Sequence, residues 1–204
     1  MRLLPSGSTA LLVELDDLDA VLALYAALAD QPPAGVVDVV PAARTVLVVT
    51  DPSATTLDAV AAAVRTTVPR PGDRSGSEVV ELPVRYDGAD LAELAGLLDL
   101  TPGELVRRHT EQEWTVAFCG FAPGFGYLTQ PGADWHVPRR ATPRTRVPPG
   151  SVALAGEFSG VYPRESPGGW QLIGRTDVEV FAIDREPAAL LRPGIRVRFV
   201  EAAG

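Results

Sequence analysis

The sequence predicts an α+β fold in which a small two-layer α/β domain is followed by a domain built as a β-barrel or sandwich. Two observations carry this prediction. The first third of the chain alternates strand and helix patterns, and after Trp114 helical periodicity gives way to short apolar runs separated by Gly and Pro. Residues 69–77, rich in Pro, Gly, Ser and charge, predict a linker. We therefore expect an N-terminal domain over 1–77 and a second domain over 78–204.

The N-terminal domain is expected to place two helices over one face of a sheet. Asp16 and Asp17 can cap an amphipathic helix that runs through Ala29, and Pro69 stops the second helix. The expected strands are 2–5 paired with 10–15 and a hairpin of 36–40 with 45–50, and the second helix spans about 55–68.

The second domain begins with an alternating strand over 78–86 and two helices. Asp90 can cap the first helix, over 91–98, and Thr101 and Glu104 form a capping box for the second, with Pro102 at its first position. This helix should end near His109. The later strands are expected at 114–119, 151–155, 171–173, 178–183 and 195–200.

Composition argues against several partners and compartments. The 204 residues carry a net charge of −8, which disfavours nucleic acid and anionic membrane surfaces as partners. No apolar run is long enough to span a membrane, and the N-terminus lacks the apolar stretch of a signal peptide. The single cysteine, Cys119, excludes an internal disulfide and is expected to be a core residue, so a cytoplasmic location is predicted.

The chain contains no lysine. A Walker-A phosphate loop and a Schiff-base lysine are therefore both excluded. With two histidines and no Cys-x-x-Cys, a Cys/His zinc site lacks ligands and no metal is assigned, although a mixed His/carboxylate site stays open. If the protein contacts ATP, arginines and backbone amides must hold the phosphates, or a partner subunit does so.

Two segments, 120–128 and 165–176, mix aromatic residues with Gly and Pro, a mixture that neither a helix nor a central strand favours. Gly lets backbone amides approach a ligand, Pro fixes the turn, and aromatic rings exclude water. We expect a pocket, with aromatic rings that plug a barrel end as the alternative. The candidate wall residues are Gly120, Phe121, Pro123, Gly124, Phe125, Tyr127, Gly168, Gly169 and Trp170.

Four arginines lie between these segments: Arg139, Arg140, Arg144 and Arg146. Guanidinium groups match carboxylate and phosphate oxygens, so these residues are candidate anion ligands. Residues 131–176 hold six arginines and three acids, so pairing within this stretch cannot neutralise all of them. The alternative is a solvated loop that pairs with acids elsewhere. Adjacent strand residues face opposite ways, so one of Arg139 and Arg140 should face the pocket.

His109 and His136 are candidate catalytic residues, because imidazole is the commonest general acid or base. A position at a helix C-terminus explains His109 equally well, through the helix dipole. Gln171 could hydrogen-bond a lactam or ureido amide, or simply a neighbouring strand.

Several segments together resemble a known family. They are His109, 120–128, 136–140, 143–152 and 160–176, with 39–44 and 51–52 in the first domain. The chain resembles the B subunit of bacterial ATP-dependent 5-oxoprolinase, a family also called Kip-type kinase inhibitor or allophanate hydrolase subunit 1. It departs from the family pattern at Gly126, where Pro is usual, and at Ser8, where Asp is usual.

This resemblance implies a cyclophilin-like barrel for the second domain. It also implies that the chain acts with a carboxyltransferase-like C subunit and a lactam-utilisation-type A subunit. That complex hydrolyses 5-oxo-L-proline to L-glutamate with ATP, and we expect the present chain to be inactive alone. In this reading the arginines of 139–146 hold a substrate carboxylate or transferred phosphate, and Gln171 orients the ring amide.

The resemblance leaves other functions open. The chain could inhibit a sporulation histidine kinase by docking through its barrel, or serve an allophanate hydrolase or urea carboxylase system. A prolyl isomerase activity would rest on fold analogy alone.

Overall fold

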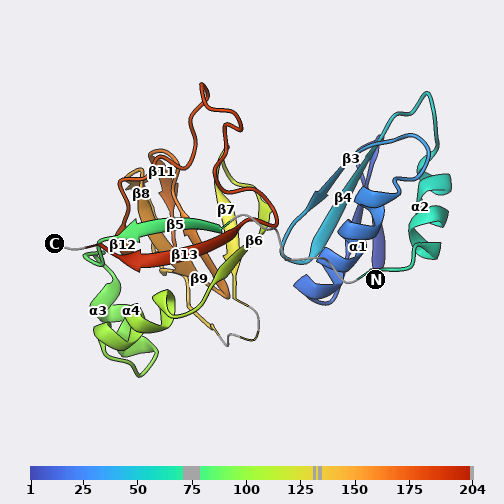
Figure 1. Cartoon of the computed structure of the whole chain (residues 1–204). Coiled ribbons are helices and arrows are strands. Elements are labelled where there is room, and N and C mark those ends of the chain that lie inside the picture. Colours follow the sequence, from blue (N-terminus) through green and yellow to red (C-terminus); the bar gives the residue numbers. More distant parts are fainter. Residues whose placement is uncertain (71–78, 131, 133–134, 203–204) are drawn as a thin grey trace. The chain divides into compact units, whose positions relative to one another are not determined.

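The computed structural model describes residues 1–70, 79–130, 132 and 135–202 and contains two compact units, Met1–Asp73 and Arg74–Gly204 (Figure 1). Most of the predicted linker, residues 71–77, lies outside the described residues.

The first unit is an antiparallel sheet with two helices on one face (Figure 1). Strand order is β1-β2-β4-β3, and residues of alternating strand positions, such as Val13 and Val46, pack against Val21 and Val60 of the helices. Asp17 caps the first helix as predicted, and Thr56 caps the second. The elements are β1 (Arg2–Ser6), β2 (Ala10–Glu14), α1 (Leu18–Asp30), β3 (Val36–Pro41), β4 (Thr45–Thr50) and α2 (Leu57–Thr66).

The second unit is a nearly closed barrel, in agreement with the predicted fold class. Its main sheet has the order β12-β9-β10-β7-β6-β13-β5, with β5 parallel to β13 and the other pairs antiparallel. The elements are β5 (Val79–Val84), α3 (Leu91–Leu97), α4 (Pro102–Thr110), β6 (Trp114–Cys119), β7 (Gly126–Thr129), β8 (Arg144–Val147), β9 (Ser151–Ala155), β10 (Phe158–Val161), β11 (Ser166–Gly168), β12 (Gln171–Arg175) and β13 (Arg196–Glu201).

A two-residue bridge closes the barrel where the ends of its sheet meet. Arg85, just after β5, and Arg175, at the end of β12, exchange both backbone hydrogen bonds at 2.9 Å. Gly174 makes this approach possible, because a Cβ atom there would collide with the carbonyl oxygen of Arg85.

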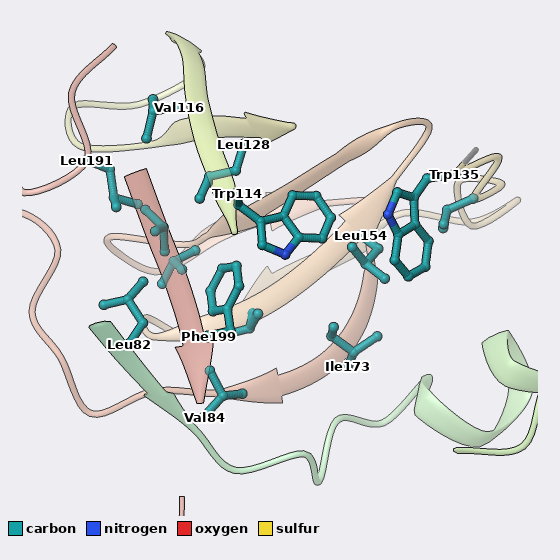
Figure 2. Packing of buried hydrophobic residues seen from close by; sticks show 14 of the residues in the cluster. Leu82, Val84, Trp114, Val116, Leu128, Trp135, Leu154, Ile173, Leu191 and Phe199 are labelled. Atoms are coloured by element: carbon teal, nitrogen blue, oxygen red, sulfur yellow. The ribbon is translucent and has the colours of Figure 1, made fainter. Parts of the chain in front are cut away.

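The barrel interior is filled by large apolar side chains from many strands (Figure 2). Trp114 on β6 and Phe199 on β13 have no exposed surface, and Trp135 packs 5.9 Å from Trp114 between ring centroids. Helices α3 and α4 contribute Leu94 and Leu105 to the same core. The α4 helix begins with the predicted capping box between Thr101 and Glu104.

Two predictions about this unit are wrong. Residues 126–129 form β7, which lies between β6 and β10, although Gly/Pro-rich aromatic sequence was expected to avoid a central strand. Gly126 is accepted there because Leu191 and Val116 pack closely over its backbone. Residues 178–183 do not form a strand: Val180 packs in the core from a loop, held by a single bridge between Phe181 and Ala189. Strands β8, β10 and β11 were not predicted.

Candidate functional site

A small aromatic pocket lies where the two Gly-, Pro- and aromatic-rich segments meet. Its volume is about 40 Å³. Phe125 stands at its centre, with the rings of Phe121, Tyr127, Tyr162 and Trp170 arranged edge-on around it at centroid distances of 5.1–5.4 Å. We call the set of lining residues the aromatic pocket: Phe121, Phe125, Tyr127, Arg139, Tyr162, Pro167, Gly168, Gly169 and Trp170.

Glycine lets the two segments approach each other. A Cβ atom at Gly168 would collide with the hydroxyl of Tyr162, and one at Gly160 on β10 would press on Phe125 and Trp170. The other predicted wall residues form the turn behind the pocket. Gly120 and Pro123 lie in that turn, and Gly124 packs against Phe181.

Arg139 supplies the positive charge of the aromatic pocket. Its side chain is exposed, and within the described part of the chain no carboxylate pairs with it. Burial raises the pKa of Tyr127 and of Tyr162, while the charge of Arg139 acts in the opposite direction. Both phenols therefore stay protonated near neutral pH and can donate hydrogen bonds beside a guanidinium group.

Arg140 and Arg144 are held by a buried carboxylate that sequence reasoning did not include in the site. Asp90 is 2% exposed and accepts hydrogen bonds from Arg140 at 2.7 Å, from Arg144 at 2.7 and 2.8 Å, and from the backbone amide of Leu172 at 2.7 Å. Burial favours a higher pKa for Asp90, but these hydrogen bonds and the two positive charges outweigh it and hold the pKa below its ordinary value. Asp90 is therefore ionised.

Asp90 was predicted only as a helix cap. It does precede α3, but its side chain makes no capping hydrogen bond because the carboxylate is turned toward the arginines. The sequence offered only one indication of this role: Asp90 is an acid, but it lies 50 residues before Arg140, and nothing local connects the two. The charge imbalance counted within 131–176 is thus relieved by acids that precede that stretch.

Arg146 and Arg175 also have partners. Arg146 pairs with Glu165 at 2.8 Å, and Arg175 pairs with Asp87 at 2.8 Å. The Arg146 and Glu165 side chains are 75% and 53% exposed, so their pair adds little stability. Arg139 and Arg140, although adjacent, have different surroundings: one lines the pocket and the other meets Asp90. Neither residue lies in a strand, so the alternation expected of strand residues does not account for this difference.

His109 lies inside the barrel, with no exposed surface. Its Nδ1 is hydrogen-bonded to the hydroxyl of Tyr86 at 2.7 Å and its Nε2 to Oγ of Ser159 at 2.9 Å. Burial lowers the pKa of His109 to about 3, so the ring is neutral at physiological pH. No surface is left at which a substrate could meet this ring, so its predicted catalytic role finds no geometric support. His136 is exposed and does not line the aromatic pocket.

Gln171 is 4% exposed and is not among the residues that line the aromatic pocket. Its Nε2 donates to the carbonyl of Pro138 at 2.9 Å, and its buried Oε1 has no hydrogen-bond partner among the described residues. This placement matches the alternative of a strand residue that bonds a neighbouring backbone. Cys119 was expected in the core but is only partly buried and packs against it, and burial raises the pKa of its thiol to about 11.

A second hollow, of about 400 Å³, lies at the seam that closes the barrel, between the segments 87–89, 148–151 and 172–177. Its carboxylates, Asp87 and Asp177, already pair with Arg175 and Arg85. Within the described ranges, no three His, Cys, Asp or Glu side chains lie close enough together to hold a metal ion. No described helix is both long and apolar enough to cross a membrane.

A family profile described as "Carboxyltransferase domain, subdomain C and D" matches residues 1–191. A 5-oxoprolinase B subunit of Escherichia coli O157:H7 is 39% identical over 204 aligned residues, which cover 95% of this chain and 93% of the relative. The protein of the same name from Bacillus subtilis (strain 168) is 45% identical over 60% of this chain and 52% of its own length.

Solved structures show the same architecture. The protein TTHA0988 is 37% identical, with a TM-score of 0.77, and this chain corresponds to 40% of that longer chain. The uncharacterised protein PH0987 from Pyrococcus horikoshii is 31% identical over 98% of this chain and 97% of its own, with a TM-score of 0.59. The urea carboxylase of Kluyveromyces lactis shares the fold at 18% identity, with a TM-score of 0.74, and this chain matches 23% of it.

Proposed function

The chain belongs to the carboxyltransferase subdomain C and D family and, within it, to the 5-oxoprolinase B subunits, and on this premise we propose that it is one subunit of a complex that hydrolyses 5-oxo-L-proline to L-glutamate with ATP. The observation that carries the proposal is the 39% identity to a named B subunit over 95% of this chain and 93% of that relative. Because the match covers nearly all of both proteins, it includes both units of this chain and the two segments that form the aromatic pocket.

The chemistry of the aromatic pocket supports this substrate. 5-Oxo-L-proline carries one carboxylate and one ring amide with a donor and an acceptor. Arg139 offers a guanidinium fork that no described carboxylate occupies, and such forks bind carboxylates through two parallel hydrogen bonds. The hydroxyls of Tyr127 and Tyr162 can donate to the ring carbonyl, and the aromatic rings exclude water from these contacts.

Arg140, Arg144 and Arg146 take a different part in this proposal from the one expected from sequence. Arg140 and Arg144 share the single carboxylate of Asp90, and both are held by it, so these two residues position the segment that carries Arg139. The backbone amide of Arg140 also donates to the carbonyl of Gly169 at 2.9 Å, which joins this segment to the pocket wall. Only Arg139 is therefore proposed as a direct ligand of the substrate carboxylate.

Neither the aromatic pocket nor the hollow at the barrel seam fits ATP. A triphosphate needs several cationic or amide donors, whereas the aromatic pocket offers one unpaired arginine and about 40 Å³. The larger hollow at the barrel seam is lined by Asp87, Asp177 and Arg175, and Arg175 already pairs with Asp87, so it does not offer phosphate oxygens an unoccupied guanidinium group. We therefore assign ATP to another member of the complex, and this chain to binding and orienting the lactam.

Reconstitution tests the function directly. This chain is purified with its carboxyltransferase-like C subunit and its lactam-utilisation-type A subunit, and glutamate formation from 5-oxo-L-proline and ATP is assayed with each component left out in turn. Glutamate should form with the complete set and disappear when this chain is omitted, and this chain alone should form none. A complete, folded set that forms no glutamate, or forms it equally without this chain, would overturn the proposal.

A further inference from the structure

Phe121 combines two features that packing alone does not explain. Its backbone φ is +67°, in the left-handed region that bulky residues avoid, and its side chain is 58% exposed. The amide of Ala122 donates to the carbonyl of Gly120 at 2.7 Å, which closes a three-residue γ-turn around Phe121. A γ-turn with positive φ is rare and strained.

Glycine would adopt this conformation without strain, and the same turn has glycine at 120 and at 124, where φ is +81°. The ring of Phe121 makes two edge-on contacts, to Phe125 at 5.4 Å and to Tyr162 at 6.2 Å. These contacts leave more than half of the side chain in water, so burial recovers little of the cost of the backbone. Strain of this kind is concentrated at ligand-binding positions.

The aromatic pocket is also too small to enclose a ligand without help. Pockets that bind small molecules usually measure about 300–1,000 Å³, whereas this one measures about 40 Å³. A ring whose carboxylate reaches Arg139 must therefore stand partly outside the pocket, against the rim. Phe121 is the exposed aromatic residue of that rim.

We propose that Phe121 is a specificity-determining residue, whose ring packs on the flat amide face of a small cyclic lactam while Arg139 holds the carboxylate. This inference rests on the proposed function and adds to it the residue that distinguishes a planar lactam from other ring carboxylates. The strained turn holds the ring at the rim in advance, so less order is lost when the ligand binds.

The experiment uses the substitutions Phe121→Gly and Phe121→Leu, with Asp99→Gly as a matched control. Asp99 is the other non-glycine residue with positive φ in the described part of the chain, at +55°, and it lies in the connection between α3 and α4. Glycine relieves backbone strain at both sites, so thermal stability should stay equal or rise in both variants. In the reconstituted complex, Phe121→Gly should raise KM for 5-oxo-L-proline at least about tenfold, with a smaller change in kcat. Asp99→Gly should leave both unchanged.

A second readout separates this inference from the proposed function. The full chain is titrated with 5-oxo-L-proline and with cyclopentanecarboxylate, a ring carboxylate without a planar amide, while the indole N–H signal of Trp170 is followed by NMR. Wild type should prefer the lactam, and both Phe121 variants should lose that preference.

The complex could form no glutamate while the wild-type chain still prefers the lactam and the Phe121 variants do not. In that case the inference stands and the proposed function fails. Two results would overturn the inference. One is an unchanged KM together with unchanged binding in the Phe121 variants, and the other is an inactive complex together with no binding of either probe. In the first of these cases, a loss of stability in Phe121→Gly would show that the residue is structural.

Discussion

At the scale of single residues, the negative charge of Asp90 holds two arginine side chains in place. Its carboxylate is 2% exposed and faces Arg140 and Arg144, whose side chains are 29% and 23% exposed. Removing the carboxylate leaves two partly buried guanidinium groups without a counter-charge, and breaking a buried pair in this way costs about 3 kcal/mol or more. The site of Arg139 would be loosened at the same time.

We therefore expect Asp90→Asn to lower the free energy of unfolding by about 3 kcal/mol. Asp87→Asn is the matched control, because Asp87 pairs with Arg175 at the surface, where the two side chains are 49% and 57% exposed. It should cost less than about 1 kcal/mol. Urea unfolding monitored by tryptophan fluorescence measures both. Equal losses in the two variants would show that Asp90 is not the anchor of this segment.

Arg139 gives the second prediction at this scale. Arg139→Gln removes the charge that no described carboxylate neutralises, so KM for 5-oxo-L-proline in the reconstituted complex should rise about 10- to 100-fold. Arg146→Gln removes an arginine of the same segment that is 75% exposed and paired with Glu165, and KM should not change. Stability should be unchanged in both. If Arg146→Gln has the larger effect, the anion site lies on the other side of the segment.

At the scale of elements, the barrel depends on one close approach of backbones. The bridge between Arg85 and Arg175 joins the strand that starts the barrel to β12, and Gly174 leaves room for it. Gly174→Ala should push this seam apart and lower the free energy of unfolding by about 2–3 kcal/mol. Gly96→Ala is the control: this position lies inside α3, nothing is within 4 Å of an added Cβ, and alanine favours a helix.

Gly96→Ala should therefore stabilise the barrel unit by about 0.5–1 kcal/mol. Thermal unfolding of both variants, with the wild-type protein beside them, checks the opposite signs. A neutral Gly174→Ala variant would mean that the seam can open locally without loss of stability.

The elements also show which kinds of signal a sequence carries. Local signals were sufficient for β6, β9 and the capping box of α4, because apolar runs and caps depend on neighbours within a few residues. Local signals were insufficient for β7, because its Gly126 is crowded by Leu191, which is distant in sequence. They were also insufficient for Arg140 and Arg144, because their partner Asp90 lies 50 and 54 residues away. Residue types alone pointed to Arg139 and to the aromatic rings that the structure brings together in one pocket, and their role as a binding site stays a prediction. The different partners of Arg140, Arg144 and Arg146 required the fold.

At the scale of the whole molecule, the two units differ in how they should respond to acid. Both histidines and all three tryptophans fall in the second unit, and the first unit contains none of either. His109 is the buried histidine, with its pKa lowered from 6.5 to about 3. Below pH 6.5 the ring of His109 is protonated in the unfolded chain but stays neutral in the folded barrel, so unfolding is accompanied by proton uptake. Its contribution to stability is therefore complete above pH 6.5 and is lost as the pH falls toward 3.

The free energy of unfolding of the second unit should thus decrease with falling pH by up to about 1.4 kcal/mol per pH unit from this residue. Tryptophan fluorescence during urea unfolding reports the second unit alone, because Trp114, Trp135 and Trp170 all lie in it. His109→Gln should flatten the slope between pH 6.5 and 5, at some cost in stability at pH 7 because the bonds to Tyr86 and Ser159 change. A slope that persists unchanged in His109→Gln would show that a group other than the buried ring titrates in this pH range.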